Sequence, residues 1–106
     1  MKQELQERWD EILNYMKKEY NISDVSFKTW LKHLKFYDVE DNIITVVIED
    51  NQMGDNALVF IQNKYGLFLK TAIAELTNEE YELNFVLRSY VEELEKKESN
   101  SGKDEL

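Results

Sequence analysis

Several residue types that build disulfides, metal sites and kinked helices are missing or scarce. The chain of 106 residues has no cysteine, no proline, three glycines and one histidine. Without cysteine there is no disulfide, no thiolate metal ligand and no thiol nucleophile. The one histidine, His33, has no second histidine or cysteine at metal-ligand spacing, so we expect neither a metal site nor a cofactor. No nucleophile–base pair can be assembled, and we therefore expect a protein that is not an enzyme.

Positively charged residues are also scarce. Lys and Arg number 13 against 22 Asp and Glu, which gives a formal net charge of -9. Such a surface repels phosphate backbones, so we expect any binding of nucleic acid to be weak. The charge is better suited to a protein whose partners are other proteins, for example ones with basic patches.

Long apolar runs are absent as well. No stretch reaches the roughly 18 apolar residues that span a bilayer, and the charged start lacks the apolar segment of a signal peptide. We therefore expect a cytoplasmic protein without membrane contact. Residues 103–106 spell the endoplasmic-reticulum retention signal. That signal has meaning only in the secretory pathway, so we interpret it as coincidence.

What the chain does contain is enough apolar material for one folded core. Hydrophobic residues make up 42% and aromatic residues 12% of the sequence. Apolar residues recur at steps of three and four over residues 3–20, which predicts an amphipathic helix. Ser23 or Ser26 can cap a second helix that extends to Leu34 and buries Phe27 and Trp30.

The rest of the chain predicts three strands and one further helix. Residues 36–39 and 43–48 read as two strands joined by a turn at Asp41-Asn42, and residues 81–87 as a third strand. A third helix is predicted over residues 57–76, with Asp55 or Asn56 as its N-cap. We expect a domain over residues 1–88 and a charged, disordered tail over residues 89–106.

The predicted order is α-α-β-β-α-β, an α+β fold with three helices on a small three-stranded sheet. Two side chains from the second helix and others from the strands and the third helix should share a single core. The predicted core residues are Trp30, Leu31, Ile44, Val46, Ile61, Tyr65, Leu69, Ile73 and Phe85.

Five sequence features, in this order, resemble the N-terminal domain (domain I) of the DnaA replication initiators over roughly residues 5 to 87. They are Trp9, the F-x-x-W-[IL] motif at residues 27–31, the turn and strand at residues 41–46, Lys64-Tyr65, and the ELTNEE passage at residues 75–80. The loop over residues 49–56 departs from the family. It lacks the usual Pro-Asn pair and is about four residues longer.

The resemblance implies a KH-like fold and a function in protein docking. Members of this family bring together replication proteins, so the implied partner is an initiator, a replicative helicase or a regulator. The alternative is a weak single-stranded nucleic-acid-binding module, but the G-x-x-G loop by which KH domains hold phosphates is missing here. The short tail and altered loop lead us to expect a free-standing homologue.

Candidate protein-binding residues lie in three places. The exposed flank of the second helix offers Ser26, Thr29, Lys32 and His33, and the start of the third helix offers Asn56. In the family, the residue at the position of Ser26 contacts the replicative helicase. Trp9 matches a family residue implicated in self-association, but it also completes the inward stripe of the first helix. Both roles, core and weak self-association, remain open for Trp9.

Overall fold

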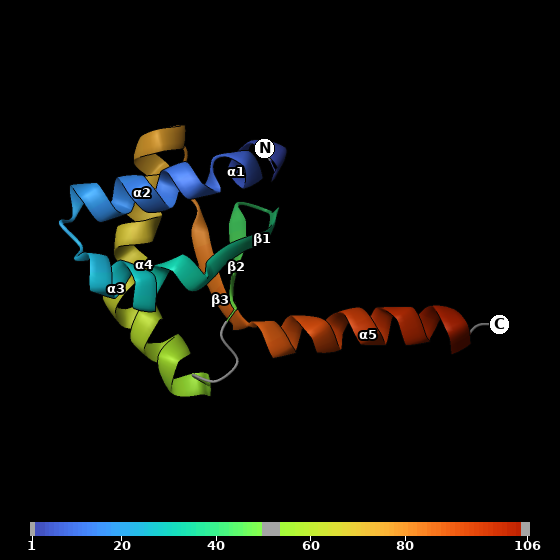
Figure 1. Ribbon diagram of the computed structural model, residues 1–106. Coiled ribbons are helices and arrows are strands. Elements are labelled where there is room, and N and C mark those ends of the chain that lie inside the picture. The colour runs from blue at the N-terminus through green and yellow to red at the C-terminus, as the bar shows by residue number, and fades with distance from the viewer. Residues whose placement is uncertain (1, 50–53, 105–106) are drawn as a thin grey trace.

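A computed structural model describes the backbone of residues 2–49 and 54–104, and the side chains of these residues except 54, 55 and 98–104. Within these ranges the chain forms an α+β fold, as predicted, with a three-stranded sheet (Figure 1). The elements are α1 (Lys2–Glu7), α2 (Trp9–Glu19), α3 (Asp24–Thr29), η1 (Leu31–His33), β1 (Leu34–Glu40), β2 (Ile43–Ile48), α4 (Gly54–Thr77), β3 (Glu82–Leu87) and α5 (Arg88–Asp104).

The single helix predicted over residues 3–20 is divided into α1 and α2 at Arg8. Arg8 leaves helical geometry (φ -96°, ψ 6°), and its Nη1 donates a hydrogen bond to the carbonyl of Leu76 at 3.2 Å. That carbonyl lies in the last turn of α4, where helical carbonyls have no intrahelical partner. The break therefore places a cation at the end of a neighbouring helix, while Leu5 and Trp9 remain on the same buried stripe.

The second predicted helix is shorter than expected. Ser23 is its N-cap, as predicted, because the Ser23 hydroxyl accepts a hydrogen bond from the N–H of Ser26 at 3.1 Å. However, α3 ends at Thr29, and one 3₁₀ turn (η1) leads directly into β1. Leu34, the predicted end of the helix, instead opens β1 and pairs with Ile48.

The sheet has the order β1-β2-β3, with an antiparallel and a parallel pair. Asp41 (φ 53°) and Asn42 (φ 62°) both adopt left-handed backbone, which confirms the predicted turn and matches the geometry of a tight hairpin. β2 and β3 run parallel, with Ile43 opposite Glu82, because α4 returns the chain to the same end of the sheet.

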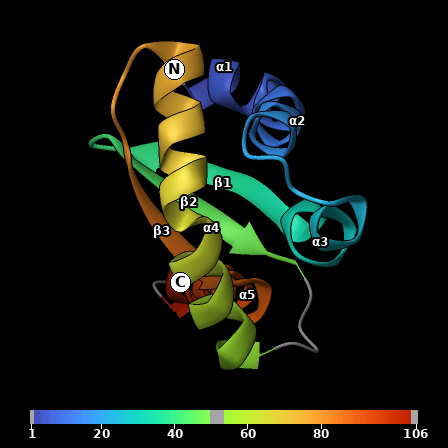
Figure 2. The same cartoon turned by 90° about the vertical axis from the view of Figure 1, so that its left-hand side faces the viewer.

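The helices α2 and α4 pack together, and α4 lies across one face of the sheet (Figure 2). Eight of the nine predicted core residues are buried there. Trp30 is the exception, because it packs against the edge of the core and stays partly exposed.

The longest helix, α4, begins at Gly54 and not at the predicted Ala57. Among the described residues, no helix is long and apolar enough to cross a membrane.

The segment after β3 is helical over residues 88–104. α5 leaves the sheet and projects from the rest of the molecule (Figure 1). Its first turns are attached to the sheet, because Val91 is only 1% exposed and Arg88 forms an ion pair with Glu49. Tyr37 of β1 also donates a hydrogen bond to Glu95 at 3.4 Å. The division into a domain over residues 1–88 and a separate tail stays a prediction.

Candidate functional site

An aromatic contact joins the end of α3 to the first half of α4. The rings of Trp30 and Phe60 lie 4.6 Å apart between centroids, tilted by 42°. Lys64, one turn further along α4, places its Nζ 5.4 Å from the centre of the Phe60 ring. Phe60 keeps 38% of its surface exposed, so this cluster is both packed and accessible. Such half-buried aromatics beside a cation are typical of binding surfaces.

A second set of contacts holds the start of α3. Lys17 of α2 forms an ion pair with Asp24 at 2.5 Å and lies over the Phe27 ring at 5.7 Å. The hydrogen bond from Lys17 lowers the pKa of the Asp24 carboxyl below its usual value. Next to Asp24, Val25 points outward with 74% of its surface exposed. α3 is therefore held at its start by Lys17 and at its end by the contact between Trp30 and Phe60. Between these contacts it exposes the apolar side chain of Val25.

The surface formed by Val25, Thr29, Trp30, Asn56, Phe60 and Lys64 is called the α3–α4 face below. Two of the predicted binding residues belong to it. Thr29 is half-buried beside Trp30, and Asn56 is exposed one turn before Phe60. Because Trp30 contacts Phe60, the predicted flank of α3 and the predicted start of α4 come together in one surface.

The other predicted residues of this flank lie around it. Ser26 is half-buried and its N–H is used in the cap of α3. Lys32 is exposed in η1, and the carbonyl of the half-buried His33 accepts a hydrogen bond from Glu49 at 2.9 Å. Of the departing loop over residues 49–56, residues 50–53 lie outside the described part of the chain.

Trp9 is placed in the core. It is 5% exposed, and its indole N–H donates to the carbonyl of Leu34 at 3.0 Å. Its ring lies 5.7 Å from that of Phe36. Both the apolar surface and the polar atom of this side chain are therefore used inside the fold, and Trp9 is not part of the α3–α4 face.

The sequence reading missed Phe60 and Lys64 as surface residues. Two adjacent apolar pairs stand in α4, Phe60-Ile61 and Phe68-Leu69. Neighbouring helical residues differ by about 100° in direction, so one member of such a pair can lie at the edge of the buried stripe. Ile61 and Leu69 are buried, while Phe60 and Phe68 are exposed. The sequence itself carried no signal for this exposure, because another adjacent pair of α4, Ala72-Ile73, is buried at both positions.

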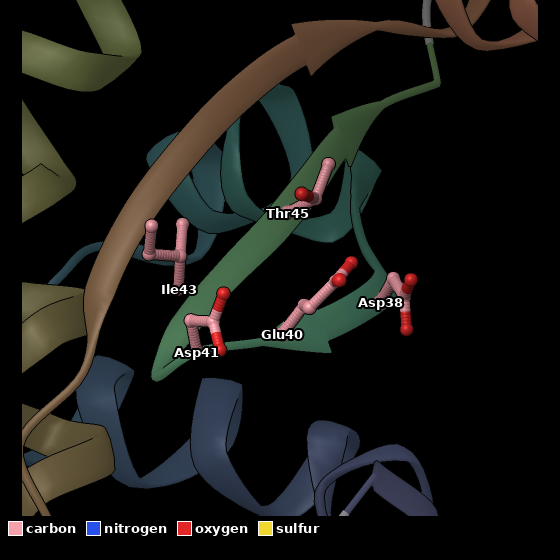
Figure 3. A pocket seen from close by; sticks show the side chains of 5 residues that line it. All are labelled: Asp38, Glu40, Asp41, Ile43 and Thr45. Carbon is pink, nitrogen blue, oxygen red and sulfur yellow. The ribbon is translucent and has the colours of Figure 1, made fainter.

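An acidic hollow of about 250 Å³ lies at the β1–β2 hairpin (Figure 3). Its lining residues are Asp38, Glu40, Asp41, Ile43 and Thr45. Lys2 neutralises part of this charge through an ion pair with Asp38 at 3.3 Å. In the part of the chain that the structure describes, no group of three or more His, Asp or Glu side chains is arranged to hold a metal ion.

Comparison with known proteins shows a similarity to a replication initiator. No protein-family model matches the chain. The chain is 53% identical over 96 residues to the chromosomal replication initiator protein DnaA of Lachnoclostridium phytofermentans. The match covers 91% of this chain and 21% of that protein, so the chain spans about a fifth of the relative's length. The resemblance drawn from the sequence motifs is thereby confirmed.

Proposed function

We propose that this chain, a relative of the N-terminal domain of the DnaA replication initiators, is a docking module that binds a protein of the replication machinery. The observation that carries the proposal is the exposed ring of Phe60, packed against Trp30 where α3 meets α4. Trp and Phe side chains that are held rigidly but left accessible are frequent anchors of protein interfaces. In this proposal the module acts in the cytoplasm by binding and not by catalysis.

The composition of the α3–α4 face supports a protein partner. Val25 and Phe60 supply apolar area, while Thr29, Asn56 and Lys64 supply polar atoms around it. An apolar centre with a polar rim is the usual composition of a specific interface. The expected partner is an initiator, a replicative helicase or a regulator of either, each of which can be purified and tested singly.

The alternative, binding of single-stranded nucleic acid, has less support. The net charge is -9, and no G-x-x-G loop is present to hold phosphates. Two lysines of α2 and α4, Lys17 and Lys64, already lie against aromatic rings, and Lys17 is also paired with Asp24. Lys28, Lys32 and Lys35 are exposed in and after α3, but they are few beside the 22 acidic residues of the chain, whereas a phosphate backbone requires a continuous basic surface.

The test combines two surface changes with a stability control. Charge reversal at Lys32 together with Asn56→Ala should change the free energy of unfolding by less than about 0.5 kcal/mol, because both side chains are exposed. The same double variant should weaken capture of the purified partner about tenfold or more in biolayer interferometry. Phe60→Ala should weaken it further, since it removes the proposed anchor.

A matched control is Lys97→Glu on α5, which makes the same charge change away from the α3–α4 face. This variant should capture the partner as the unchanged chain does. If Phe60→Ala binds every tested replication protein normally, the α3–α4 face is not the docking surface. If capture is lost only on changing Trp9, self-association becomes the better account.

A further inference from the structure

The outer edge of β3 is unpaired. Within the described residues, β2 is the only strand that pairs with β3. The N–H of Glu82 donates to Asn42 at the start of β2, at 2.9 Å. Since main-chain groups alternate in direction along a strand, Leu83 and Phe85 direct theirs to the opposite edge. No hydrogen bond from another described residue reaches these two residues there.

A continuous groove runs beside this edge. Two hollows of about 270 and 290 Å³ lie between α4 and β3, and Phe85 lines both. The α4 side of the groove consists of residues at four-residue steps, which form one row along the helix. This row is Leu58, Gln62, Gly66 and Lys70. The groove therefore follows the open edge of β3 over its whole length.

The groove is apolar along its floor and open at its walls. Phe85 is buried, Leu83 packs against the core, and both side chains face α4. Leu67 on the helix wall is 72% exposed, and Tyr90 at the far end is also exposed. Gly66 has no side chain to fill the space beside the Phe85 ring, from which an added Cβ would lie 3.7 Å away. Apolar side chains of a bound peptide would pack against these residues.

The charge around the groove is negative. Its two cations are already paired, Lys70 with Glu82 at 2.8 Å and Arg88 with Glu49. Glu80 before β3 and Glu93 one turn after Tyr90 have no ion pair with any described residue. Glu82 is exposed at the start of this edge but already pairs with Lys70 of α4, and Asn84 is exposed on the other face of the sheet. A segment that added a strand here would gain from basic side chains, because Glu80 and Glu93 have no such pair among the described residues.

We propose that this groove binds an extended peptide segment of alternating apolar and basic residues, which joins the sheet as a fourth strand beside β3. The segment's main chain pairs with Leu83 and Phe85, its apolar side chains enter the groove toward α4, and its basic side chains lie on the other face of the sheet. Unpaired edge strands beside apolar pockets bind peptides in this way. A second copy of the chain fits poorly, because each copy carries a net charge of -9 and residues 82–87 include no basic residue.

This site is separate from the α3–α4 face and goes beyond the proposed function. The probe is a labelled peptide of about eight residues that alternates valine and lysine, long enough to pair with the six residues of β3. Three matched peptides serve as controls: one with glutamate in place of lysine, one with the same residues in two blocks, and one N-methylated at alternate amides. Binding is measured by fluorescence anisotropy at roughly 0.15 M salt.

The alternating lysine peptide should bind at least about tenfold more tightly than each of the three controls. Leu67→Arg should weaken it by about tenfold or more, since the change places a cation and a longer side chain in the groove. Val59→Arg makes the same kind of change at an exposed position of α4 outside the groove and should leave the affinity within about twofold.

Amide hydrogen exchange followed by NMR identifies the edge itself. The peptide should slow exchange at Leu83 and Phe85, while Glu82, Asn84 and Val86 change little because their amides already face β2. Equal binding of the glutamate or N-methylated peptide would overturn the proposal. So would unchanged exchange at Leu83 and Phe85 with peptide bound, or displacement of the peptide from this edge by single-stranded DNA.

Discussion

Replacing Trp9 by phenylalanine distinguishes a core role for this residue from a role in self-association. The phenyl ring preserves much of the apolar contact with Phe36, but it cannot donate to the carbonyl of Leu34. A buried acceptor left without a donor costs about 1–3 kcal/mol. The smaller ring also leaves a partial cavity, so we expect the free energy of unfolding to fall by about 2–4 kcal/mol.

The measurement is urea unfolding at equilibrium. Trp30 is the only other tryptophan, so its fluorescence reports on the variant without interference. Circular dichroism on the same samples shows whether the two probes follow one transition, which the two-state treatment requires. Val25→Ala, at a position that is 74% exposed, is the control and should change stability by less than about 0.5 kcal/mol.

Two results would contradict a core role for Trp9. If Trp9→Phe lowers stability by less than about 0.5 kcal/mol, the hydrogen bond to Leu34 does not hold the fold together. If the same variant also abolishes a concentration-dependent dimer in analytical ultracentrifugation, the indole lies between two copies of the chain. Either finding would refute the placement of Trp9 in the core.

Two further predictions follow from contacts of the sheet, and a third follows from the net charge of -9. Hydrogen bonding by Arg88 holds the pKa of Glu49 below its ordinary value of 4.5, so the stability from this pair is fully present above that pH. It is lost as the pH falls through the lower folded-state pKa. The melting temperature of Arg88→Ala should therefore lie below that of the unchanged chain at pH 7 and approach it near roughly pH 3. Ending the chain after residue 97 should leave urea unfolding unchanged, whereas ending it after residue 88 removes the buried Val91 and should cost about 1.5–3 kcal/mol. Labelled single-stranded DNA titrated at physiological salt should bind with dissociation constants of about 10⁻⁴ to 10⁻⁶ M, and a nanomolar value with base preference would support the nucleic-acid alternative.

The elements whose signals are local could be predicted from the sequence. The Asp41-Asn42 turn was predicted because both residue types tolerate left-handed backbone, and the structure confirms this. The run over residues 43–48 is entirely β-branched and forms β2, which is buried over most of its length. Ser23 was one of two proposed caps, and its hydroxyl geometry confirms that choice.

Features that depend on distant contacts could not be predicted. The break at Arg8 depends on the end of α4, which lies 68 residues further along the chain. The exposure of Phe60 depends on which flank of α4 meets the sheet, and its ring is covered in part by Trp30 from another helix. The first turns of α5 depend on Val91 packing against the sheet. A single-sequence pattern contains none of these pairings.

The parallel pairing of β2 with β3 has a consequence for how the chain folds. The β1–β2 hairpin closes through a two-residue turn, so it can form early. β3 can join only after the whole of α4 has folded back across the sheet, because α4 lies between the two strands in the sequence. Until then, the Ile-Ile-Thr-Val-Val-Ile sequence of β2 has one open edge. We therefore expect nascent or truncated chains that end before residue 82 to aggregate through β2.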